Sequence, residues 1–107
     1  MKSRFVKPAE DELAEAVDHY DQITPGLGDR FLAEARGAVR LIEEFPHNSP
    51  VVARQVKRKV LLEFPYSLFY IVTPDEVVIL ALAHQKRRPL YWKRRIPKST
   101  ANVRPAR

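Results

Sequence analysis

The sequence predicts an α+β domain in which an N-terminal strand and a helical hairpin pack on a small, mainly antiparallel sheet, in the order β-α-α-β-β-β. Two observations predict this class. Apolar residues recur at helical spacing through the first half of the chain, and short apolar runs bounded by turn residues follow in the second half. A length of 107 residues fits one domain. We expect that domain to span residues 1–96, and residues 97–107 to form a basic, disordered tail.

The first half of the chain predicts one short strand and two helices. Residues 3–7 form the strand, and Pro8 suits the first turn of the helix that follows, where its missing N–H costs nothing. The breaker Thr24-Pro25-Gly26 ends this helix. A second helix is expected over residues 28–44, ending where Phe45 precedes a proline. The apolar face of the first helix is predicted to contain Leu13, Ala16, Val17 and Tyr20.

The second half predicts three strands, at residues 56–63, 67–73 and 77–83. A turn at residues 73–76 separates the last two, because Pro74 is pre-set for the first central position of a turn. The run VVILALA is apolar on both faces, which indicates a central strand covered on each side. Residues 89–95 fit either one helical turn or a strand extension.

Charge is segregated along the chain. Residues 84–107 hold nine Lys or Arg and no acidic residue, whereas residues 1–50 hold six Lys or Arg against ten Asp or Glu. This asymmetry favours a polyphosphate or an acidic protein as partner. The absence of cysteine excludes a disulfide scaffold, and the three histidines show no ligand spacing, so we expect neither a metal nor a cofactor. With no apolar run of about 18 residues, we expect a cytoplasmic protein without a membrane contact.

The chain contains the four stretches PAEDELAEAVDHY, LGDRFLAEA, FPYSLFY and VVILALAHQKRRPLYWKRR. With these stretches, residues 4–95 resemble the RelE/ParE superfamily of bacterial type II toxins, and in particular the ParE-like toxins of plasmid stabilisation systems. The resemblance implies a RelE/ParE-like fold and a toxin that arrests growth until a cognate acidic antitoxin neutralises it. Operator DNA would be bound only through the antitoxin complex. RelE-like members cleave mRNA in the ribosomal A site, whereas ParE-like members poison DNA gyrase.

A metal-independent endoribonuclease needs a base, an acid and cations around the reacting phosphate. Our catalytic candidates are Arg87, His84 and Tyr91: Arg87 grips a phosphate, His84 titrates near neutrality, and Tyr91, like Trp92, stacks on bases. A ParE-like toxin would have no catalytic activity. The cations expected to contact nucleic acid or another target are Arg58, Lys59, Lys86, Arg88, Lys93 and Arg94.

Each candidate also has a purely structural interpretation. His84 fits a histidine hydrogen-bonded to backbone, Trp92 fits a core residue under the helical hairpin, and Arg58 and Lys59 alternate along a strand, so only one of the two faces a given site. RelE-like nucleases usually place an arginine after the tyrosine that begins their third strand, where this chain has Ser67. That departure favours DNA gyrase over mRNA as the target of the toxin. A non-toxic nucleic-acid-binding module and an inactive toxin remain the alternatives.

Overall fold

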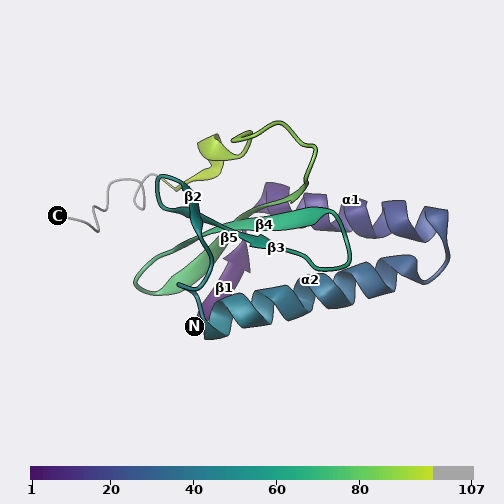
Figure 1. Ribbon diagram of the computed structural model, residues 1–107, viewed down its shortest axis with the longest axis horizontal. Helices are drawn as coiled ribbons and strands as arrows, with labels where there is room; N and C mark the ends of the chain where they lie inside the picture. Colours follow the sequence, from purple (N-terminus) through teal and green to yellow (C-terminus); the bar gives the residue numbers. More distant parts are fainter. Residues whose placement is uncertain (98–107) are drawn as a thin grey trace.

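Two helices and a five-stranded sheet make up residues 1–97, the part of the chain that the computed structural model describes (Figure 1). The strand order is β1-β5-β4-β3-β2; β1 and β5 are parallel and the other neighbours are antiparallel. The predicted α+β class and its hairpin are confirmed. The elements are β1 (Lys2–Phe5), α1 (Lys7–Ile23), α2 (Leu27–Glu44), β2 (Val51–Ala53), β3 (Val56–Val60), β4 (Tyr66–Val72), β5 (Glu76–His84) and a single 3-10 turn, η1 (Lys93–Arg95).

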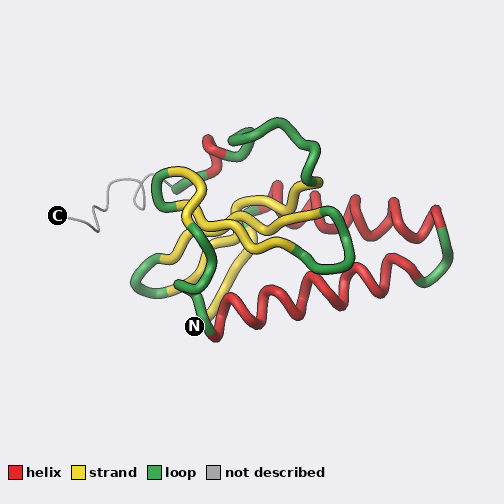
Figure 2. The backbone as a smooth tube through the Cα atoms, in the orientation of Figure 1, coloured by secondary structure: helices red, strands yellow, loops and turns green. Residues whose placement is uncertain are grey.

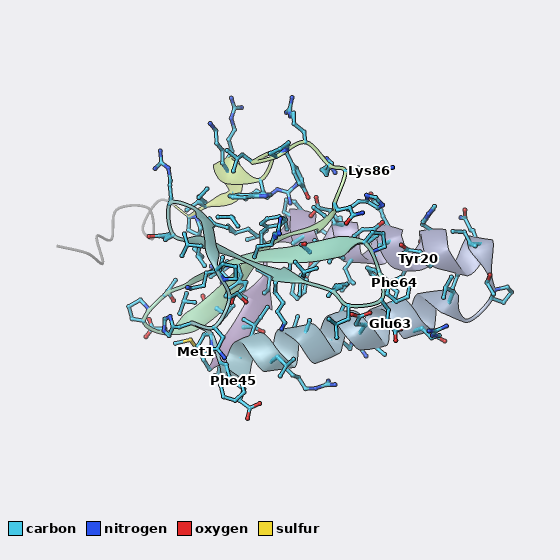
Figure 3. All side chains as sticks on the ribbon, in the orientation of Figure 1. Met1, Tyr20, Phe45, Glu63, Phe64 and Lys86 are labelled. Atoms are coloured by element: carbon cyan, nitrogen blue, oxygen red, sulfur yellow. The ribbon has the colours of Figure 1, made fainter. Side chains whose placement is uncertain are left out.

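The sheet lies between two apolar layers. Side chains of α1 and α2 pack on one face, where Tyr20 lies beside Phe64 with their ring centroids 4.9 Å apart (Figure 3). The loop after β5 and η1 cover the other face, around Trp92 and Phe69 (Figure 2). β5 is buried throughout Val77–Ala83, which confirms the central strand covered on each side. Within residues 1–97 no helix combines the length and apolarity needed to cross a bilayer.

Trp92 is a core residue, as its size suggested, but the prediction that it packs under the helical hairpin is wrong. It lies in the layer on the opposite face of the sheet, with its ring centroid 5.1 Å from that of Phe69. Phe69 is on this face because side chains alternate along β4, so that Leu68 and Tyr70 point to the helices. The segment after β5 therefore folds back over the sheet instead of passing beneath α1.

The predicted strand at residues 56–63 ends early, at Val60. The Glu34 carboxylate on α2 accepts the backbone N–H groups of Leu62 and Glu63, and so holds these residues in a turn. A carboxylate that binds two adjacent N–H groups removes the donors that a strand needs for its ladder.

A short edge strand, β2, was not predicted. It joins β3 through a two-residue turn in which Arg54 has a φ of 51°. Turns of this kind usually contain Gly, Asn or Asp, and this one contains Arg54-Gln55, so the sequence shows no turn signal there. Of the two interpretations of residues 89–95, the helical turn is the one observed, as η1. The predicted tail at residues 97–107 lies outside the described residues, apart from Pro97.

Gly28 allows α1 and α2 to approach closely, and replacing it with alanine will destabilise the domain. A Cβ at this position would lie 2.5 Å from the carbonyl oxygen of Val17, and the Gly28 N–H donates to the Asp21 carboxylate at 2.8 Å. We expect Gly28→Ala to cost about 1–3 kcal/mol in urea denaturation, because backbone must shift. Gly37→Ala is the matched control: nothing lies closer than 3.9 Å, and it should gain about 0.5–1 kcal/mol. Equal stabilities of the two variants would contradict this account.

Candidate functional site

A cleft of about 250 Å³ opens on the sheet face opposite the helices, between the β3–β4 pair and the loop after β5. The loop is fixed at its start by two backbone hydrogen bonds, from Gln85 N–H to the Pro65 carbonyl at 2.8 Å and from Arg87 N–H to the His84 carbonyl at 2.9 Å. The residues that line the cleft are Val52, Arg58, Ser67, Phe69, Ala83, His84, Gln85, Arg87, Arg88, Pro89, Leu90, Tyr91 and Trp92.

The cleft brings together five of the nine predicted site residues: Arg58, His84, Arg87, Arg88 and Tyr91. Among these, the three arginines are exposed, so their charges face solvent and any partner that enters the cleft. The cleft is therefore suited to a ligand with negative charge.

The other four predicted residues lie outside this cleft. Lys59 points to the helix face of the sheet, because it pairs with Leu68, whereas Arg58 pairs with Phe69 on the cleft face. Lys86 lies on the outer side of the loop (Figure 3). Lys93 and Arg94 line a second hollow, which shares residues 88–91 with the cleft. The cations thus form a broader surface around the cleft, with Lys59 on the far side of the sheet.

His84 is held in place by local contacts. Its Nδ1 accepts the backbone N–H of Lys86 at 3.0 Å, and its ring stands edge-on to Tyr66 with centroids 5.2 Å apart. This hydrogen bond occupies the lone pair of Nδ1, so Nδ1 is not free for proton abstraction. The contact fits the structural interpretation of His84 as a histidine hydrogen-bonded to backbone.

Tyr91 is held by a carboxylate that sequence reasoning missed. Its hydroxyl donates to Oε2 of Glu12 on α1 at 2.7 Å, and the same carboxylate accepts both terminal nitrogens of Arg95, at 2.9 and 3.1 Å. Glu12 and Arg95 are largely buried, with 13% and 19% of their side chains exposed. A signal existed: Glu12 is three residues after Ala9 and four before Ala16, the two buried residues of α1, so it lies on the same face.

The same pair satisfies an open edge of the sheet. β1 pairs with β5 only as far as Ile79, so among residues 1–97 the later backbone groups of β5 have no strand partner on that side. Glu12 accepts the N–H of Leu82 at 3.0 Å, and Arg95 donates to the carbonyl of Leu80 at 3.0 Å. Glu12 and Arg95 therefore replace a strand along this edge.

Burial raises the pKa of the Tyr91 phenol, and the hydrogen bond to the Glu12 carboxylate raises it further. A phenol with so high a pKa does not ionise near neutral pH and is poorly matched to proton transfer there. No three carboxylate, histidine or cysteine side chains cluster to hold a metal ion anywhere in residues 1–97. The arrangement offers positive charge and shape, with little acid–base chemistry.

The raised pKa of Tyr91 makes stability fall at alkaline pH. The pKa of Tyr91 in the folded state exceeds the unfolded value of 10.0. The protonated phenol therefore stabilises the folded protein fully below about pH 10, and this stabilisation is lost as the pH rises towards the folded-state pKa. We expect Tyr91→Phe to remove up to about 1.4 kcal/mol per pH unit from this slope. Urea denaturation between pH 9 and 11 measures it. The other tyrosines titrate in both proteins, so parallel curves for the two would contradict this assignment.

Comparison with known proteins identifies the family. The sequence model described as the ParE toxin of the type II toxin-antitoxin system parDE matches residues 4–89. A chain in the solved structure titled "Chromosomal ParDE TA system from P. aeruginosa" is similar in fold, with a TM-score of 0.60 and 19% identity, over 78% of this chain and 95% of that one. Among curated proteins no sequence match is found. Since the family model spans most of the sequence, this chain belongs to the ParE toxin family of type II toxin-antitoxin systems.

Proposed function

We propose that this toxin arrests growth as a ParE-like poison of DNA gyrase, and not as a RelE-like endoribonuclease. The observation that carries the proposal is the uncharged floor of the cleft. Ser67, with 7% of its surface exposed, lies there with Phe69 and Ala83, where a RelE-like nuclease would place an arginine. Cleavage of RNA needs a cation directly against the charge that develops on the phosphate, and a buried hydroxyl at this position does not supply one. The cations of the cleft are instead the exposed Arg58, Arg87 and Arg88.

Two of the predicted catalytic residues, His84 and Tyr91, support the same proposal. Nδ1 of His84 accepts a backbone N–H, and the hydroxyl of Tyr91 donates a hydrogen bond to the Glu12 carboxylate. Hydrogen bonds therefore already engage Nδ1 of His84 and the hydroxyl of Tyr91, which leaves neither atom free for proton transfer. The exposed Arg58, Arg87 and Arg88 are left as a surface that contacts the target by charge and shape.

We propose a cognate acidic antitoxin as the partner that covers this surface. Large apolar side chains are exposed along the outer edge of the sheet, next to Arg58 and the cleft: Leu62 is 94% exposed, and Val51, Val52 and Val60 are also exposed. β2 pairs with β3 only at Val56 and Lys57, so the stretch of β3 that leads to Leu62 is left as an open edge. An extended segment that alternates apolar and acidic residues fits this edge. Leu62→Asp should weaken antitoxin binding about tenfold or more without unfolding the domain. Unchanged affinity would exclude this edge as the docking site.

Induction of the chain in a bacterium, with pulse labelling of DNA and protein synthesis, tests the target. We expect DNA synthesis to fall first, with an SOS response, and Arg87→Ala to relieve the arrest. Arg36→Ala, which removes an exposed cation of α2 on the opposite layer, is the matched control and should still arrest growth. A first fall in protein synthesis would favour the mRNA endonuclease instead. Normal growth together with salt-dependent binding to isolated DNA or RNA would favour a non-toxic nucleic-acid-binding module.

A further inference from the structure

Glu12 joins three parts of the chain that are distant in sequence. Its carboxylate, on α1, accepts the Leu82 N–H of β5, the Tyr91 hydroxyl and the Arg95 guanidinium, at distances between 2.7 and 3.1 Å. Tyr91 follows Leu90, whose φ of 62° is rare for a branched side chain, so this part of the loop is held in a restricted conformation. The position of the Tyr91 ring is fixed by its hydroxyl, and also by the guanidinium carbon of Arg95, which lies 4.9 Å from the ring centroid.

The Tyr91 ring in turn holds Arg87. The guanidinium carbon of Arg87 lies 3.8 Å from the ring centroid, a close cation–π contact. Arg87 is otherwise exposed, in a loop whose neighbouring residues 85–90 are also exposed. A long side chain in such a place samples many rotamers unless something restrains it, and the face of Tyr91 supplies that restraint.

This arrangement orients Arg87 without neutralising it. The charge of Glu12 is balanced by Arg95, through two hydrogen bonds between buried groups. None of the ion pairs found among residues 1–97 includes Arg87. An aromatic face attracts a guanidinium but carries no net charge, so the positive charge of Arg87 remains available to an anionic group of a partner.

We propose that Glu12 is a positioning residue for toxin action. Its carboxylate holds the Tyr91 ring through the hydroxyl, and the ring in turn orients Arg87 towards the cleft. This inference rests on the proposed role of Arg87 as a target contact. Glu12 itself touches no partner, because it is largely buried between α1, β5 and the loop. Glu12 therefore acts on the target only indirectly, through the orientation of the exposed Arg87. This role is distinct from its contribution to the stability of the fold.

The orientation of Arg87 can be observed directly by NMR. Protons of a guanidinium stacked on an aromatic face are shifted to low frequency by the ring current, and Arg87→Lys identifies the resonance. We expect the shift in the wild type, a smaller shift in Glu12→Gln, and its loss in Tyr91→Leu. Tyr91→Phe isolates the hydroxyl, because it keeps the ring and leaves the Glu12–Arg95 pair intact, and it should reduce the shift even if Glu12→Gln fails to fold.

Growth arrest provides the second measurement, at matched levels of folded protein. Tyr91→Phe and Glu12→Gln should need about tenfold more toxin than the wild type, the effect of misplacing one charged contact, while their affinity for the antitoxin edge around Leu62 is unchanged. If folded Tyr91→Phe keeps both the wild-type shift and the wild-type potency, the proposal is overturned; a lost shift with full potency overturns it too. The identity of the target is determined separately, by whether DNA synthesis or protein synthesis stops first in cells that express the wild type.

Discussion

Trp92→Ala will lower the free energy of unfolding by about 3–5 kcal/mol, the usual cost of removing a large buried aromatic side chain. Trp92 is 2% exposed and is the largest side chain of the apolar layer opposite the helices, where it packs with Phe69. Within residues 1–97 no α-helix covers this face of the sheet, so its core depends on the loop after β5 and on η1. Because a domain of this size has only about 5–15 kcal/mol to lose, the variant should melt roughly 12 °C or more below the wild type.

Thermal unfolding followed by circular dichroism measures this effect, and Trp92→Phe is the matched control. Phenylalanine keeps a ring against Phe69, so it should lose less than half as much stability. Trp92 is also the only tryptophan of the chain, and its fluorescence in the wild type should be that of a buried indole until the domain unfolds. A melting temperature within a few degrees of the wild type for Trp92→Ala would show that this layer contributes little.

The fold could be predicted from the sequence wherever local pattern and tertiary burial agree. The first helix follows from the helical spacing of Leu13, Ala16 and Tyr20, and the central strand follows from the run of β5 that is apolar on both faces. Both predictions are confirmed. β2 could not be predicted, because its turn places Arg54 in the left-handed region without a glycine or asparagine to indicate it. The early end of β3 depends on Glu34, a residue of α2, and no local pattern reports a contact made across the fold.

The candidate site was predicted less completely, for a physical reason. Runs of cations indicate where positive charge gathers, and Arg58, Arg87 and Arg88 do line one cleft. Charge alone does not say which side chains are held and which are free. Glu12 is one of several acidic residues near the start of α1, and only its spacing from Ala9 and Ala16 distinguishes it by placing it on the buried face. Arg95 looked like one more cation of a basic segment, and it is the partner of Glu12.

Arg95→Met will cost about 3–5 kcal/mol, since it leaves the buried Glu12 carboxylate without a countercharge. It also removes the donor to the Leu80 carbonyl. Chemical denaturation measures the loss. Arg4→Met is the matched control: the ion pair of Arg4 with Glu76 is as short, at 2.8 Å, but Arg4 is half-exposed, and such pairs contribute less than about 1 kcal/mol. Equal losses from the two arginines would mean that burial does not decide the strength of these pairs.

A double-mutant cycle shows whether the loss belongs to the pair. Glu12→Gln combined with Arg95→Met removes both charges, and its cost should be at least about 1 kcal/mol smaller than the sum of the two single changes. Additive costs would assign the effect to separate contacts.

The result also bears on where the domain ends. The family match stops at residue 89, yet Trp92 and Arg95 lie beyond it and hold the second face and the open edge of the sheet. If both predictions hold, residues 90–97 are part of the folded toxin, and a chain cut at the limit of the family match would lose about as much stability as a small domain possesses.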